Sequence, residues 1–178
     1  MAENLDLKTA WLKDLGEFIV EANKNTWAAD APEVTPQRPG YKELEYRSPN
    51  GLWLLRDSYT GYFRAPGMTT VYYKDTPSWA MTYGGKGMVE AHYQIVKPTF
   101  EFLKQALMKV TPELPFRGPF EFVEGNKKYT FKLDGNVEDC SWVEEITENG
   151  DLTFTQNGFA GIIIHRSPDR LPQHPWEL

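Results

Sequence analysis

Cysteine and histidine are scarce in this chain. Of its 178 residues, one is a cysteine, Cys140, and three are histidines. A single cysteine excludes an internal disulfide framework and is typical of a reducing compartment. No histidine has a second histidine or a cysteine at the spacing of metal ligands. We therefore expect no metal and no other cofactor.

Long apolar runs are also missing. The longest stretch without formal charge, residues 152–165, is too short and too polar to cross a bilayer, which takes about 20 apolar residues. The first six residues include two acidic side chains and no apolar core, so we expect no secretory signal. These features predict a soluble, cytoplasmic protein without a membrane partner.

Basic residues are fewer than acidic ones in this chain. Acidic residues number 25 against 19 basic ones, which gives a net charge of -6, and the longest basic run is Lys127-Lys128. A protein that grips phosphate backbones needs a basic face. We therefore expect no nucleic-acid binding by this chain alone.

Catalytic motifs are absent as well. The sequence has no Gly-x-Ser-x-Gly nucleophile elbow. Residues 84–87 are rich in glycine but precede no clear helix start, so we interpret them as the end of a hairpin and not as a phosphate loop. Cys140 has no base beside it in the sequence, and we interpret it as a packing residue. These absences favour a protein that is not an enzyme.

Aromatic residues are plentiful at 14% of the chain, and the apolar pattern predicts both helices and strands. Apolar residues spaced by three and four predict one helix around residues 11–22 and a second from Pro98 or Thr99 to Val110. Alternating patterns predict eight strands, with turn signals at Asn50-Gly51, Gly125-Asn126 and Asn149-Gly150.

The predicted fold is α+β, a curved antiparallel sheet of about eight strands packed against two helices on its concave side. Both halves have the order helix, then four strands. A duplicated αββββ unit accounts for this, and so does the coincidence of similar hairpins in any α+β protein. Residues 1–166 are expected to form one domain. Residues 167–178 are expected to be a proline-rich tail that is loose unless Trp176 docks.

The segment from Leu52 to Gly61 places two opposite charges in a strand that is otherwise apolar on both faces. Alternation sends Arg56 to one face and Asp57 to the other, so they cannot pair with each other. We expect Glu43 or Glu45 to meet Arg56, and Arg38, Arg47 or Arg117 to meet Asp57. A structural ion pair is the preferred interpretation of Asp57; a carboxyl in an aromatic cavity, able to act as a general base, is the alternative.

Two runs, Arg56-Asp57-Ser58-Tyr59 and Phe116-Arg117-Gly118-Pro119, are the most specific parts of a pattern that extends from the first helix to Gly161. This pattern resembles an uncharacterised family of bacterial and archaeal domains of unknown function. Such a family implies no activity, cofactor or catalytic residue. Some members sit behind helix-turn-helix domains, which implies a sensor or effector module. The other matching runs are Arg38-Pro39-Gly40, Leu44-Glu45-Tyr46, Trp53, Gly61, Pro77-Ser78-Trp79, Met81 and Tyr83-Gly84.

Three functions stay open. The leading hypothesis is a non-catalytic module that binds a small molecule or a peptide against an aromatic face. The second is a small enzyme with Asp57 as general base and Arg56 or Arg117 as anion clamp. The third is an interaction protein that uses a sheet edge. The aromatic residues are read either as core alone or as core plus pocket. The candidate ligand-binding residues are Arg56, Asp57, Tyr59, Trp79, Tyr83 and Arg117.

Overall fold

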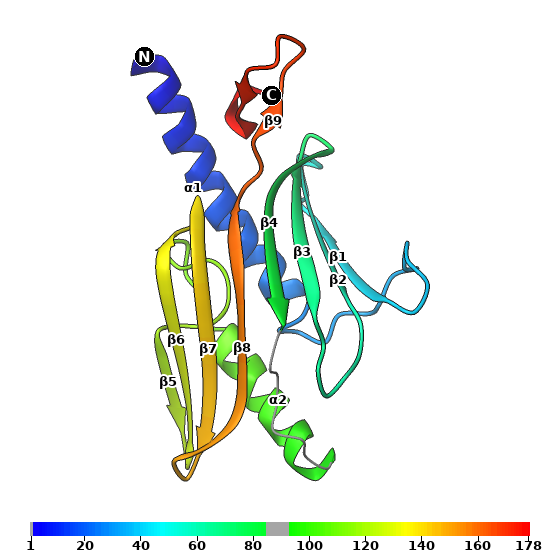
Figure 1. Cartoon of the computed structure of the whole chain (residues 1–178), viewed down its shortest axis with the longest axis vertical. Helices are drawn as coiled ribbons and strands as arrows, with labels where there is room; N and C mark the ends of the chain where they lie inside the picture. The colour runs from blue at the N-terminus through cyan, green and yellow to red at the C-terminus, as the bar shows by residue number, and fades with distance from the viewer. Residues whose placement is uncertain (1, 85–92) are drawn as a thin grey trace.

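Two long helices and an eight-stranded sheet account for most of the described residues, 2–84 and 93–178, in this computed structural model (Figure 1). The helices are α1 (Ala2–Asn25) and α2 (Tyr93–Leu107). The chain ends in a short hairpin and a single 3₁₀ turn, which are β9 (His165–Arg166), β10 (Pro172–Gln173) and η1 (Pro175–Glu177).

All strands of the large sheet run antiparallel to their neighbours, in the order β1-β2-β3-β4-β8-β7-β6-β5. Neighbours in the sequence pair with each other, and β4 joins β8 at the centre. The α+β class and the antiparallel pairing are therefore confirmed, whereas the expected curvature is not. The strands are β1 (Lys42–Arg47), β2 (Trp53–Tyr59), β3 (Gly67–Tyr73), β4 (Thr76–Gly84), β5 (Glu121–Glu124), β6 (Lys127–Asn136), β7 (Asp139–Glu148) and β8 (Asp151–Ile162).

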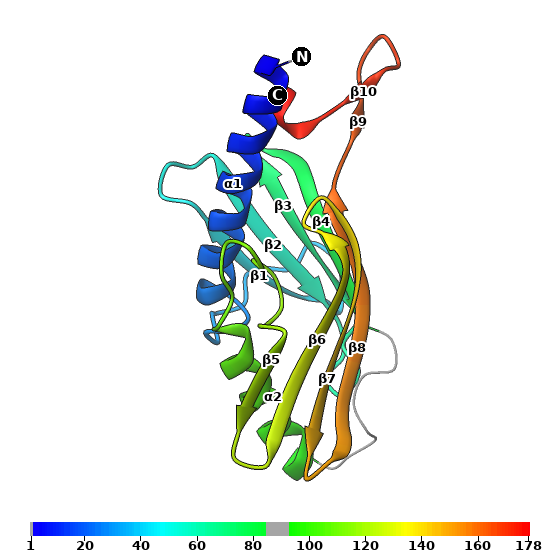
Figure 2. The ribbon, with the colours of Figure 1, turned by 90° about the vertical axis from the view of Figure 1, so that its left-hand side faces the viewer.

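The two helices lie on the same side of the sheet (Figure 2). Helix α1 packs on β1 and β2, and α2 packs on β6. The predicted apolar stripe of α1 is buried, because its spacing places Leu15, Ile19 and Ala22 against the sheet. These residues belong to one hydrophobic core that runs under both helices. No helix within the described ranges is long and apolar enough to cross a bilayer.

The two halves of the sheet share one irregularity at matching places. Both β3–β4 and β7–β8 shift register close to the hairpin turn, between Val71 and Tyr72 near the end of β3 and between Ile146 and Thr147 near the end of β7. In each half of the sheet the four strands also follow the chain order from the edge to the centre, β1 to β4 in one half and β5 to β8 in the other. Both observations are those that a repeated helix-and-four-strand unit produces; a duplication in evolution stays a prediction.

The predicted bounds of the second helix need correction. Helix α2 begins at Tyr93, before the predicted start at Pro98 or Thr99, and ends at Leu107, before the predicted end at Val110, so Pro98 lies inside it. Pro98 is the sixth residue of the helix, beyond the first four, whose N–H groups have no intrahelical partner. The helix therefore lacks the hydrogen bond that a residue at this position would donate to the Gln94 carbonyl.

The C-terminal segment docks through Trp176, which is the condition on which an ordered tail was expected. Its Nε1 donates to Asn4 Oδ1 at 2.9 Å. Residues 85–87 of the predicted glycine-rich hairpin end lie outside the described residues.

Candidate ligand-binding cavity

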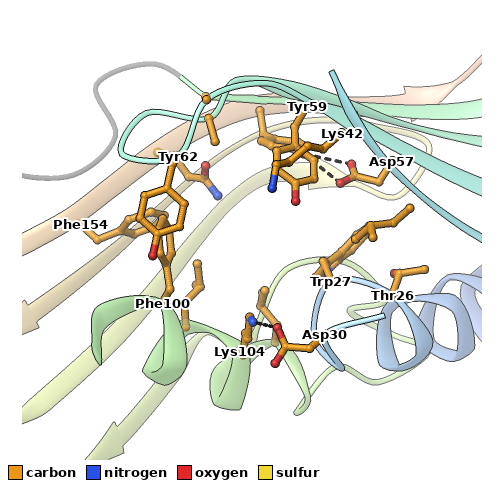
Figure 3. Close-up of a pocket in the computed structure, with 18 of the residues that line it drawn as sticks. Thr26, Trp27, Asp30, Lys42, Asp57, Tyr59, Tyr62, Phe100, Lys104 and Phe154 are labelled. Atoms are coloured by element: carbon orange, nitrogen blue, oxygen red, sulfur yellow. Dashed lines mark hydrogen bonds and ion pairs between the residues drawn. The ribbon is translucent and has the colours of Figure 1, made fainter. Parts of the chain in front are cut away.

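A cavity of about 530 Å³ lies over the centre of the sheet, between the end of α1 and α2 (Figure 3). Helix α1 covers one half of the sheet and α2 the other, so the space between them is bounded by loops and side chains. The lining combines residues from the segment after α1, from β1, β2, β4 and β8, from α2 and from the loop before β5.

Aromatic side chains form much of the cavity wall. Trp27 follows α1, Tyr59 ends β2, and Tyr62 lies in the next loop. The Tyr62 ring is 5.6 Å from that of Phe100 on α2, which in turn is 6.3 Å from Phe154 on β8. Figure 3 shows these rings around the space. The wall therefore offers apolar faces to a ligand.

Charged side chains at the rim are paired with one another. Lys42 on β1 lies 2.8 Å from Glu33, and Lys104 on α2 pairs with Asp30. Lys97 and Glu101 lie 3.9 Å apart on successive turns of α2. These three pairs therefore add no net charge to the rim.

Asp57 lies at the floor of the cavity and is buried, with 2% of the residue exposed. It is on the same face of β2 as Trp53 and Leu55, as the alternation predicted. Thr69 Oγ1 donates to Asp57 Oδ1 at 2.7 Å, and the Tyr83 hydroxyl lies 3.1 and 3.0 Å from the two carboxyl oxygens. Two hydroxyl groups thus hold the carboxyl in place.

Gly67 makes the contact between Tyr83 and Asp57 possible. Gly67 and Tyr83 are cross-strand partners on β3 and β4. A Cβ atom at Gly67 would lie 2.4 Å from the Tyr83 hydroxyl oxygen, which is far closer than atoms approach one another. The missing side chain therefore lets the tyrosine ring lie across the neighbouring strand and reach β2.

Burial raises the pKa of Asp57 to about 6, because a charged carboxylate loses its hydration there. The hydrogen bonds from Thr69 and Tyr83, and the positive charge of Arg117, oppose this rise. Burial and the nearby carboxylate raise the pKa of Tyr83 well above its ordinary value, so its hydroxyl stays a donor. At neutral pH the floor of the cavity therefore holds a carboxylate with two neutral donors.

Arg117 lines the same cavity, but its guanidinium is bound elsewhere. Its Nε donates to Glu144 Oε2 at 3.1 Å and its Nη2 to Glu144 Oε1, and both residues are buried. Tyr129 and Gln156 also donate to the Glu144 carboxylate. Arg117 has a φ of 62°, a left-handed conformation that L residues rarely adopt. A dense polar cluster thus adjoins Asp57.

The structure brings together four of the six candidate residues named from the sequence. Asp57, Tyr59, Tyr83 and Arg117 line the cavity. Arg56 lies on the opposite face of the sheet, where its Nε donates to Glu45 at 3.1 Å and its Nη1 lies 3.6 Å from Glu43 Oε2, so it meets both of the expected partners. Trp79 is fully buried in the core and donates to the Val137 carbonyl. The aromatic residues therefore form a core and also a pocket, and the cavity described here does not include Arg56 or Trp79.

The preferred interpretation of Asp57 as half of an ion pair is wrong. Within the described residues no basic side chain reaches ion-pair distance of its carboxyl group. Arg117, one of the expected partners, pairs with Glu144 because that carboxylate lies on the adjoining part of the same sheet face. Two hydroxyl groups take the place of the expected cation.

Sequence reasoning missed Glu144, Thr69 and Gln156. A signal for Glu144 was present, since it alternates with Trp142 and Ile146, both buried. Cys140 is a packing residue as expected: its thiol is buried and its pKa is raised to about 11, mainly by burial. Among the described residues no group of three or more potential ligands could hold a metal ion.

Comparison with known proteins finds one family. A family model described as a domain of unknown function, DUF5680, matches residues 57–163, more than half of the chain. The match begins at Asp57 and includes Tyr59, Tyr83 and Arg117. No curated protein and no solved structure matches significantly. The bacterial and archaeal origin and the helix-turn-helix neighbours of the resemblance stay predictions.

Proposed function

Because the chain belongs to the DUF5680 family, whose function is unknown, we propose its role from the cavity: a non-catalytic module that binds one small molecule. The observation that carries the proposal is the Asp57 carboxyl at the floor of an aromatic cavity, held by two hydroxyl groups and by no cation among the described residues. A buried carboxylate without a counter-charge is costly. A bound ligand could offset that cost.

The size and composition of the cavity support a small ligand. Small-molecule sites are typically about 300–1,000 Å³, mostly apolar, with a few polar groups that fix orientation. A cavity of about 530 Å³ with aromatic walls and one carboxyl at its floor fits this description. A peptide bound by strand addition would use the sheet edges at β1 and β5 instead, away from these groups.

A small enzyme is the second candidate, and the raised pKa of Asp57 favours it. A pKa of about 6 is suited to a general base near neutral pH. The anion clamp of that hypothesis is weaker, since Arg56 faces the other side of the sheet and Arg117 is bound by Glu144. Binding alone needs neither arginine, which is why we prefer it.

A cavity-filling variant tests the proposal. Ala31 lines the cavity, whereas Ala29 in the same turn region is exposed and does not. We expect fragments from a library of small aromatic and aliphatic compounds to raise the melting temperature of the wild type and of Ala29→Phe, but not of Ala31→Phe. A fragment at 100 times its dissociation constant adds about 2.7 kcal/mol of stability.

Two outcomes would count against it. Fragments that stabilise all three proteins equally, or none of them, would show that the cavity is not a binding site. Mass analysis of the bound fragments after incubation separates the two candidates: unchanged compounds support a binding module, and a converted product supports the enzyme.

A further inference from the structure

We propose that the ligand is a small aliphatic amine with an aromatic or apolar body, whose ammonium group binds the Asp57 carboxylate. This rests on the proposed function of the cavity and specifies the chemistry of its ligand. The inference follows from the charge balance of the lining, from the unused hydrogen-bonding capacity of Asp57, and from the aromatic wall.

The first step is the charge balance. The three basic groups at the rim each lie beside an acidic one, in the pairs of Lys42 with Glu33, Lys97 with Glu101 and Lys104 with Asp30. At the floor, Arg117 is bound by Glu144 through two of its nitrogen atoms. Among the described residues of the lining, Asp57 is the remaining charged group, and none of their cations pairs with it. One positive charge on a ligand therefore completes the balance.

The second step is the acceptor count at Asp57. An ionised carboxylate offers about four lone-pair sites. Oδ1 accepts from Thr69 at 2.7 Å and shares the Tyr83 hydroxyl, while Oδ2 has only its share of Tyr83 at 3.0 Å. Oδ2 can therefore accept a further N–H. A charge-assisted hydrogen bond is stronger than one between neutral groups, so an ammonium group suits this oxygen better than a hydroxyl does.

The third step is the wall. Cations are attracted to the faces of aromatic rings, more strongly where water is excluded. Tyr59 and Tyr83 lie next to Asp57 on the lining, and Trp27, Tyr62 and Phe100 extend the aromatic surface away from the floor. The near rings suit the ammonium group, and the far rings suit an apolar body. An anionic ligand would instead be repelled by the negative charge of Asp57.

The pH dependence of amine binding is expected to come from Asp57 and not from the groups that face it. Thr69 faces it from β3, Tyr83 from β4, Tyr59 from its own strand, and Arg117 from the loop before β5. Arg117 stays charged, and burial raises the pKa of both tyrosines, so none of these groups changes charge between pH 5 and 8. Protonation of Asp57 below about pH 6 removes the site's negative charge.

Three probes of similar shape and different charge test the inference: 2-phenylethylamine, 2-phenylethanol and 3-phenylpropionate, titrated by calorimetry at pH 7.5. We expect the amine to bind most tightly. Asp57→Asn should weaken amine binding by about ten- to hundredfold, the range expected for loss of a charge-assisted hydrogen bond. Asp75→Asn makes the same chemical change outside the cavity lining and should leave the affinity unchanged, since Asp75 is an exposed side chain beside Arg47.

A measurement on the wild type guards against misfolding of the variant. Lowering the pH from 7.5 to 5 should weaken the amine and leave the alcohol unaffected. Tighter binding of the alcohol or the carboxylate, or no binding of the amine while library fragments still distinguish Ala31→Phe from Ala29→Phe, overturns the amine and leaves the cavity function standing. Failure of every fragment overturns both.

Discussion

Asp57 shows how a buried carboxyl group can be held without an ion pair. Its two hydroxyl partners stabilise the ionised form, yet burial outweighs them and the pKa rises to about 6. The raised pKa means that the folded state holds the Asp57 proton more tightly than the unfolded chain does. The residue therefore destabilises the fold when it is ionised.

This residue predicts a particular pH dependence of stability. Between the unfolded pKa, near 3.8, and the folded pKa, about 6, the folded state binds more protons, so the Asp57 contribution to the free energy of unfolding falls as pH rises. The fall is about 2 kcal/mol between pH 4 and pH 7, at roughly 1.4 kcal/mol per pKa unit, because the fall begins only above the unfolded pKa and is nearly complete at pH 7. The Asp57→Asn variant should not show this fall in the free energy of unfolding.

Urea melts of the wild type and Asp57→Asn at pH 4, 5, 6 and 7 measure the difference. Other acidic groups contribute equally to both proteins, so the difference isolates Asp57. A constant gap between the two stability curves would show that its pKa is not raised in the folded state.

At the scale of elements, strands β6, β7 and β8 carry a polar cluster on a face that is otherwise apolar. Glu144 on β7 is fully buried and accepts from Tyr129 on β6 and Gln156 on β8, as well as from Arg117. A loss of Arg117 would leave this carboxylate buried without its cation. Such a loss is far more costly than the pair's net contribution to stability.

We expect Arg117→Met to lower the free energy of unfolding by about 3–5 kcal/mol. Lys127→Met is the matched control, because Lys127 on β6 pairs with Glu148 on β7, the strand that also carries Glu144, and this pair is more exposed. That change should cost about 1 kcal/mol or less. Chemical denaturation at pH 7 compares the two, and similar losses would contradict the role given to the buried cluster.

At the scale of the whole molecule, the two helices explain why there is a cavity at all. Helix α1 packs on β1 and β2, and α2 packs on β6, so the strands at the centre of the sheet are covered by loops and aromatic side chains. The C-terminal segment lies at the far end of the molecule, beside the start of α1 (Figure 2). It packs there through Trp176, whose ring centroid is 6.0 Å from that of Trp11.

Because Trp176 docks far from the cavity, its removal is expected to lower stability without changing ligand affinity. Trp176→Ala removes the contact with Trp11 and the hydrogen bond to Asn4, so we expect a loss of about 1–3 kcal/mol. Leu171→Ala in the same segment changes an exposed side chain and should cost less than about 0.5 kcal/mol. Thermal melts measure both.

Amine binding by Trp176→Ala should match that of the wild type, because the two sites lie at opposite ends of α1. A change in both stability and affinity would show that the C-terminal segment and the cavity are coupled.

Local patterns in the sequence determined the elements of this protein. Spacing by three and four predicted α1, and alternation with Asn-Gly turns predicted the strands and their antiparallel pairing, because these signals act over a few residues. Alternation also placed Arg56 and Asp57 on opposite faces. The start of α2 was misjudged because a proline early in a helix is compatible with more than one boundary.

Only the tertiary structure decided what meets across the sheet. The pairing of β4 with β8 brings the two halves together, and it places the Arg117–Glu144 pair next to Asp57 and Tyr83. Several arginines were compatible with Asp57 in sequence, and none of the described ones pairs with it. The choice depends on strand order and on the space left at Gly67, and such long-range geometry has no local signature in the chain.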